Sequence, residues 1–221
     1  MTRRGSMSLI LTAISLALAS ASYSGKTAYV LVFLNSNPKR AVLPERQLDS
    51  LQSAHMANIN RLAKEGKLIA AGPFEGGGGI FVLQTADLSE ARSWVGSDPA
   101  VQANRFIVEL FSYAPRTGSF CRVEGKITMV SYHFVRYAPS DTASPSALAK
   151  AWADHRAQVE RISSADSVLS EGTLDGDKGA ILIVKGKFDE SFVREDPAVR
   201  QGYLAAAIKE IWIARGALCE Q

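Results

Sequence analysis

The chain has 221 residues, of which 47% are hydrophobic and 21% charged, as in an ordinary globular protein with one large or two small domains. Arg3 and Arg4 are two of its 25 basic residues, so the rest of the chain carries 23 basic against 22 acidic side chains. This balance leaves no basic patch or charged tail, and we expect no nucleic-acid partner.

The first 21 residues are typical of a secretory signal peptide. A basic start, MTRR, precedes the apolar run SLILTAISLALAS, and Ala19, Ser20 and Ala21 have the small side chains of a cleavage site. The run is too short to span a bilayer of roughly 30 Å as a helix. We therefore expect cleavage after Ala21, a secreted or periplasmic protein and no membrane association afterwards; the alternatives are an uncleaved anchor or a start at Met7.

The first predicted elements occupy residues 27–115. A strand is expected at 27–36, TAYVLVFLNS, and a helix near 45–65 carries His55 on its apolar face. KLIAAGPF and GIFVLQT follow, and the glycines at 76–79 connect them as a hairpin turn rather than a phosphate loop, because a strand and not a helix comes next. A second helix, the sequence DPAV and the strand RFIVELFSYAP complete the series.

The same series returns about 100 residues later, which indicates an internal repeat. At a shift of 100, His55 aligns with His155, and three glycines align with three others: Gly72, Gly76 and Gly79 with Gly172, Gly176 and Gly179. At a shift of 98, DPAV at 98–101 aligns with DPAV at 196–199. The final strands are aligned through ELF at 109–111 and EIW at 210–212.

Each copy has the order strand, helix, strand, strand, helix, strand, which is that of a ferredoxin-like unit. The strands are apolar at both alternating positions, as in residues 29–34, so both faces of each sheet must be covered. We therefore predict an α+β protein in which two tandem ferredoxin-like (βαββαβ) units form an intramolecular dimeric α+β barrel. The domains would be 22–115 and 126–221, with a linker at 116–125, and the protein would be a monomer.

The helix and turn pattern H…L…G.L..AGPF…GG, followed by SDPAV and a last strand, resembles the YCII (YciI-like) family. The resemblance covers both copies and is weaker in the second. It implies two YCII-like domains, a fold that pairs into an α+β barrel, and a His–Asp pair proposed as an acid–base site. By position in the pattern these residues are His55 and Asp98, with His155 and Asp196 as a possible second site. The family also contains a dehydrochlorinase of hydroxylated aromatics, which makes a small phenolic substrate conceivable.

The residues themselves support proton transfer. Imidazole exchanges protons near neutral pH, and a neighbouring carboxylate fixes its tautomer. Since no G-x-S-x-G elbow or nearby cysteine supplies a nucleophile, we expect a lyase or isomerase acting on a small molecule. Three alternatives stay open: His55 as a core residue, Asp98 as a turn former before Pro99, and a binding module without turnover.

No cofactor and no metal are expected, because no His/Cys cluster has zinc-ligand spacing. Related α+β barrels also host haem enzymes, but no ligand pattern indicates haem here. Gly72, Pro73 and Phe74 are expected to line the ligand pocket.

Cys121 and Cys219 each follow the last strand of a copy. In an exported protein an even pair favours a disulfide over two free thiols.

The two sites are expected to be unequal, with the first one competent. Two residues are missing between Gly179 and Asp196 relative to the first copy. Because consecutive Cα atoms are about 3.8 Å apart, this shortening could shift Asp196 out of reach of His155; the alternative is that it falls harmlessly in the preceding turn.

Overall fold

The computed structural model describes residues 29–141, 143–163 and 167–219. The predicted signal peptide at 1–21 lies outside the described residues. The first half contains β1 (Tyr29–Ser36), α1 (Glu45–Lys64), β2 (Leu68–Pro73), β3 (Gly79–Leu83), α2 (Leu88–Gly96), α3 (Pro99–Gln102) and β4 (Phe106–Thr117). The second contains β5 (Met129–Pro139), α4 (Pro145–Ser163), β6 (Val168–Leu174), β7 (Gly179–Val184), α5 (Ser191–Arg194), α6 (Pro197–Arg200) and β8 (Leu204–Ala214).

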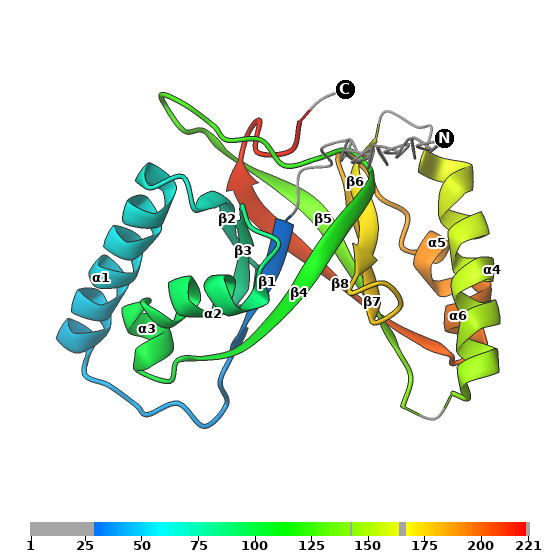
Figure 1. The fold of residues 1–221 in the computed structure, drawn as a ribbon, viewed down its shortest axis with the longest axis horizontal. Coiled ribbons are helices and arrows are strands. Elements are labelled where there is room, and N and C mark those ends of the chain that lie inside the picture. Colours follow the sequence, from blue (N-terminus) through cyan, green and yellow to red (C-terminus); the bar gives the residue numbers. More distant parts are fainter. Residues whose placement is uncertain (1–28, 142, 164–166, 220–221) are drawn as a thin grey trace, which may run out of the picture.

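The chain is therefore a mixed α+β protein whose two halves share one order of elements. All strand pairs are antiparallel and form one sheet with the order β2-β3-β1-β4-β6-β7-β5-β8. Helices α1, α2 and α3 lie on one outer side of this sheet, and α4, α5 and α6 lie on the opposite side (Figure 1). The predicted second helix of each half is divided into two short helices, because Asp98 and Asp196 each start a new one before a proline.

The sheet curves into a nearly closed barrel. At the long joint, β4 of the first half pairs with β6 of the second, from Tyr113 opposite Leu174 to Thr117 opposite Glu171. At the short joint, the outer strands β2 and β8 meet through a single bridge between Phe74 and Ile211. The two joints lie at equivalent places in the two halves, so the sheet is almost continuous around the barrel.

Strand β1 shows why both faces of the sheet are apolar. Tyr29, Leu31 and Phe33 point into a core inside the barrel that contains side chains from both halves. The alternate residues of β1 pack under the helices of the first half, and a third core lies under those of the second. The expectation that both sheet faces are covered is confirmed.

The first glycine shared by the two copies has a structural explanation at the two places where the halves meet. A Cβ atom on Gly72 would lie 2.8 Å from the carbonyl oxygen of Trp212, and one on Gly172 would lie even nearer to that of Ala114. Each glycine thus lets a strand of the other half approach closely. The glycines at 76–78 adopt positive φ angles in the β2–β3 turn, which confirms the predicted hairpin.

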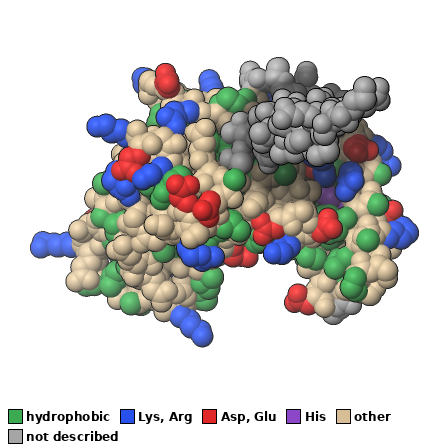
Figure 2. Space-filling model, in the orientation of Figure 1, with side chains coloured by type: hydrophobic (Ala, Val, Ile, Leu, Met, Phe, Trp, Pro, Cys, Tyr) green, Lys and Arg blue, Asp and Glu red, His purple; other side chains and the backbone are tan. Residues whose placement is uncertain are grey.

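Charged side chains of both signs are interspersed on the face shown in Figure 2. No helix among the described residues is long and apolar enough to cross a membrane.

Candidate functional site

His55 and Asp98 form a direct pair in the first half. His55 lies on the face of α1 that packs against the sheet and α3, and its Nδ1 is 2.9 and 2.8 Å from the two carboxylate oxygens of Asp98. Asp98 is the residue before α3 and accepts hydrogen bonds from the backbone N–H groups of Ala100 and Val101. The turn-forming and pairing roles considered for Asp98 therefore coexist in one carboxylate.

The charge state of Asp98 determines the tautomer of His55. Burial of this fully enclosed carboxylate raises its pKa, but the hydrogen bonds from His55, Asn58 and the Ala100 N–H outweigh burial and hold the pKa below its usual value. An ionised carboxylate only accepts hydrogen bonds, so Nδ1 of His55 carries a proton and donates it. In the neutral ring, Nε2 is then the basic nitrogen.

The ring of His55 contacts two aromatic side chains, and 12% of the His55 side chain is exposed. It stacks on Phe81 from β3 and is tilted against Phe106 from β4, with ring centroids 6.0 Å apart in both cases. No described residue forms a hydrogen bond with Nε2. This nitrogen is available to a small molecule that reaches the ring.

An open pocket of about 320 Å³ lies next to residues that contact this pair, although neither His55 nor Asp98 is among its lining residues. Its lining residues come from the end of β1, the loop after it, the first turns of α1 and the start of β4: Ser36, Arg40, Leu48, Asp49, Leu51, Gln52, Ala100, Arg105 and Phe106. Phe106 also contacts the His55 ring, and Ala100 also donates to Asp98. A second pocket of about 410 Å³ shares Arg40, Leu48 and Arg105 with the first, so the two form one groove.

The second pair, His155 and Asp196, is also formed. Nδ1 of His155 lies 2.7 Å from Oδ2 of Asp196, and Asp196 caps α6 through the N–H of Ala198. The expectation that the shorter segment before Asp196 uncouples this pair is wrong. The missing residues are taken up before α6, where α5 is a single turn of Ser191–Arg194 and α2 is a helix of Leu88–Gly96.

The surroundings, rather than the pairing, distinguish the two histidines. His155 is only 2% exposed and is enclosed by Tyr137 and Trp152, whose ring centroids are 4.3 and 5.6 Å away. Trp152 stands three residues before His155, where the first half has Gln52 in the pocket wall. The bulky indole thus closes, in the second half, the region that is open beside His55.

The three residues expected to line the pocket lie elsewhere. Gly72 is at the short joint, Phe74 is buried in the barrel core, and Pro73 is exposed between them. The pocket beside His55 is formed by other residues. The sequence reasoning also missed Asn58, whose side chain donates to Asp98 at 3.0 Å. Its position three residues after His55, on the same helix face, was the available signal.

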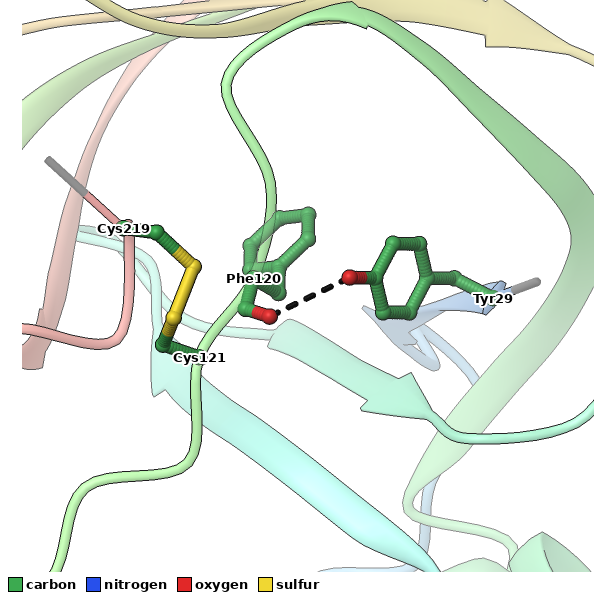
Figure 3. The surroundings of a disulfide bond; sticks show 4 residues. All are labelled: Tyr29, Phe120, Cys121 and Cys219. Atoms are coloured by element: carbon green, nitrogen blue, oxygen red, sulfur yellow. Dashed lines mark hydrogen bonds between the residues drawn. A yellow bond between two sulfur atoms is a disulfide. The ribbon is translucent and has the colours of Figure 1, made fainter. Parts of the chain in front are cut away.

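Cys121 and Cys219 form a disulfide, as expected, with Cα atoms 5.3 Å apart (Figure 3). The bond joins the segments that follow β4 and β8, which also meet through a bridge between Phe120 and Leu218. Beside it, the hydroxyl of Tyr29 donates to the carbonyl oxygen of Phe120 at 3.2 Å.

Within the described ranges, no group of three or more His, Cys, Asp or Glu side chains is arranged to hold a metal ion.

Comparison with known proteins identifies a YCII-related domain at residues 28–112. The family resemblance is thereby confirmed for the first half, and for the second half it stays a prediction. No curated protein matches the chain.

Several solved structures resemble the chain at low similarity. A provisionally assigned monooxygenase from Lactobacillus acidophilus NCFM has a TM-score of 0.43 and 11% identity, covering 85% of this chain and 94% of its own. A second, from Fusobacterium nucleatum, has a TM-score of 0.46 and 9% identity, covering 85% and 92%. An anthrone oxidase-like protein has a TM-score of 0.48 and 9% identity, covering 87% and 93%. These values are too low to transfer an activity.

Proposed function

We propose that the protein is an exported acid–base enzyme that binds a small molecule in its first half and transfers a proton through His55 and Asp98. The single observation that carries this proposal is that Nδ1 of His55 is fixed by a buried, ionised carboxylate, while Nε2 has no hydrogen-bond partner among the described residues and the ring contacts Phe106 in the wall of an open pocket. A histidine that serves only in packing is expected to resemble His155, whose side chain is only 2% exposed.

The chemistry follows from this arrangement. Nε2 of His55 removes a proton from an acidic C–H or O–H group of the bound molecule, and the carboxylate of Asp98 stabilises the imidazolium that forms. The same nitrogen then returns the proton at another atom, which gives an isomerisation, or keeps it while a leaving group departs, which gives an elimination. A phenolic or other small aromatic substrate is compatible with the apolar side of the pocket at Leu51 and Phe106.

Proton abstraction can be tested before a substrate is known. The protein would be incubated in D2O with a panel of small C–H acids, and loss of the exchangeable proton signal followed by NMR. We expect exchange of at least one compound by the wild type and a loss of about 10²–10⁴-fold in the His55→Gln variant, since glutamine can donate to Asp98 but cannot act as a base.

The matched control is His155→Gln, which should keep most of the exchange rate. Equal losses from the two substitutions, or a larger loss from His155→Gln, would show that the wrong histidine has been chosen. Exchange that survives His55→Gln unchanged would refute the proposed base.

A binding module without turnover is the second candidate, favoured by the open groove itself, which needs no proton transfer to hold a ligand. In that case ligands would bind to the wild type and to His55→Gln with similar affinity, and no compound of the panel would exchange its proton.

We also propose that the two halves are tandem ferredoxin-like units and that the protein is a monomer. The supporting observation is that the strand order is β2-β3-β1-β4 in one half and β6-β7-β5-β8 in the other, with matching element order. Export is supported by the sequence of residues 1–21 and by the disulfide, which persists in oxidising compartments.

A further inference from the structure

We propose that the groove beside His55 binds the anionic head group of a small organic acid, with Arg40 and Arg105 as the residues that recognise a carboxylate. This inference rests on the proposed function, because it names the class of substrate that would reach His55. The head group would lie between the two guanidinium groups and the apolar body would lie on Phe106, toward the imidazole.

Both guanidinium groups are held in place by backbone carbonyl groups. Nη1 of Arg105 donates to the carbonyl oxygen of Ala41 at 2.5 Å, and Nη1 of Arg40 donates to that of Asn37 at 3.3 Å. Each of these hydrogen bonds uses one N–H group of a guanidinium. The remaining N–H groups of each guanidinium are left for a ligand, and two such forks match the planar geometry of a carboxylate.

No acidic side chain in the described part of the chain forms an ion pair with either arginine. No described carboxylate lies within 4.0 Å of a guanidinium nitrogen of either arginine, although Asp49 is also part of the pocket wall. Both arginines line both pockets of the groove. An unpaired pair of cations in a concave site attracts an anion and raises its local concentration.

The loop that carries Arg40 is tied firmly to the start of β4. The buried side chain of Asn37 donates to the carbonyl oxygen of Asn104 at 3.0 Å and accepts from the backbone N–H of Lys39 at 2.9 Å. The backbone N–H of Asn37 donates to the carbonyl oxygen of Arg105 at 2.9 Å. These contacts hold the two arginines near each other before any ligand arrives, which lowers the entropy cost of binding.

The described residues of the second half do not reproduce this basic site. There the equivalent backbone bond runs from the N–H of Ser140 to the carbonyl oxygen of Tyr203, so tyrosine replaces Arg105, and Leu204 follows in place of Phe106. The chain after β5 reads Ser-Asp-Thr-Ala-Ser and contains no arginine. The basic pair therefore occurs in the half in which the region beside the histidine is open.

The test compares two probes of the same shape, benzoate and benzamide, by ligand-observed NMR titration of the full chain. We expect benzoate to bind at least about tenfold more tightly than benzamide, because charge-assisted hydrogen bonds are worth more than neutral ones. Arg40→Gln and Arg105→Gln should each weaken benzoate binding by about tenfold or more without weakening benzamide. Benzoate binding should also weaken between 50 and 500 mM salt, concentrations chosen to span the range over which exposed charges become screened.

Lys39→Gln is the matched control, since it removes a positive charge from the same loop outside the two pockets and should leave the preference for benzoate unchanged. The proposal is overturned if the wild type does not prefer benzoate, if neither probe binds, or if the preference survives in both arginine variants. It is also overturned if inorganic phosphate displaces benzoate at equal concentration, because the site would then recognise a free anion without its apolar body. Arg40 is exposed, so Arg40→Gln keeps the test decisive if Arg105→Gln fails to fold.

His55→Gln separates this proposal from the proposed function. If the variant binds benzoate like the wild type but the wild type shows no proton exchange, the acid–base function fails and the anion site stands. If proton exchange depends on His55 but the arginine variants bind benzoate normally, the anion site fails and the function stands.

Discussion

Asp98 combines two tasks in one buried carboxylate, since it starts helix α3 and holds His55. Its four hydrogen-bond donors come from two side chains and two backbone N–H groups. Burial raises its pKa, but the hydrogen bonds from His55, Asn58 and the Ala100 N–H outweigh burial and lower it. A fully buried carboxylate without such donors would instead be held neutral. The pair can therefore support a charged imidazole in a region shielded from water.

This lowered pKa predicts a pH dependence of stability. At pH values above 3.8, the pKa of Asp98 in the unfolded chain, the ionised carboxylate stabilises the fold. This contribution to stability is lost as the pH falls through the lower pKa of Asp98 in the folded protein. We expect Asp98→Asn to be about 1–3 kcal/mol less stable than the wild type at pH 7. The difference should shrink toward pH 3. Urea unfolding at both pH values measures it, and a difference that stays constant would contradict the assignment.

The two histidines should differ in their effect on stability. His155 is enclosed, and it is the side-chain donor that the described structure shows for Asp196, whereas Asp98 keeps Asn58 when His55 is removed. We expect His155→Ala to cost about 3–5 kcal/mol, through a cavity and a poorly paired buried carboxylate. His55→Ala should cost less, because its side chain is partly exposed. Guanidinium unfolding of both variants provides the comparison, and an equal or larger loss in His55→Ala would be inconsistent with this view.

The His–Asp pairing could be predicted from the resemblance to the YCII family, and the internal repeat extended it to His155 and Asp196, but the reason for the inequality of the two pairs could not be predicted. The sequence pointed to the shortened segment before Asp196, whereas the structure places the difference at Gln52 and Trp152 on the helices. A tryptophan on an apolar helix face is typical of an ordinary core position. That this tryptophan helps to enclose His155, together with Tyr137 from a distant strand, appears only in the folded structure.

At the scale of elements, the joints between the halves depend on glycine. An alanine at position 172 would place Cβ against the backbone of Ala114 in the long joint, and one at position 72 would place it against the backbone of Trp212 in the short joint. Backbone atoms cannot move aside as a flexible side chain can. We expect Gly172→Ala and Gly72→Ala to be destabilising, by about 1–3 kcal/mol, with the larger effect at Gly172.

Gly96→Ala is the matched control for these variants. It lies in α2, a Cβ atom there would meet nothing within 4 Å, and alanine favours a helix over glycine. Thermal unfolding should show an unchanged or higher melting temperature for Gly96→Ala and lower ones for the joint variants. If Gly72→Ala and Gly172→Ala melt like the wild type, the close approach at the joints is not real.

The order of elements was predictable, but the alignment of the last strands was not. The similarity of ELF and EIW aligned Glu109 of the first copy with Glu210 of the second. The structure instead makes Ser112 the equivalent of Glu210, since their carbonyl oxygens accept from the N–H groups of Asp175 and Glu75, respectively. The correct shift is 98, as for DPAV. Apolar strands resemble one another in several registers, and only the pairing across the barrel selects one.

At the scale of the whole molecule, the disulfide closes the end of the barrel that lies away from the groove. Cys121 follows the end of β4, whereas Arg105 precedes its first residue. We therefore expect Cys121→Ser with Cys219→Ser to reduce stability by up to about 4–5 kcal/mol through chain entropy. The affinity for a ligand of the groove should stay within about twofold, because a local change far from a site usually has little effect on it. Denaturant unfolding with and without reductant, beside benzoate titration, tests both parts, and a loss of affinity without a loss of stability would contradict the argument.

The last prediction concerns why both halves stand in one chain. The barrel core contains Phe33, Phe74 and Tyr113 from the first half packed with residues such as Phe134 and Ile211 from the second. Residues 22–120 alone would expose this apolar face and leave the edge strands β2 and β4 unpaired, which is a surface that recruits another chain. Because β4 pairs with β6 here and β2 meets β8 at an equivalent place, a second copy of the half could satisfy both edges at once. We expect light scattering to give the mass of one chain for the whole protein and a dimer or larger aggregates for 22–120. A stable, monomeric half would show that the barrel core is not what holds the two halves together.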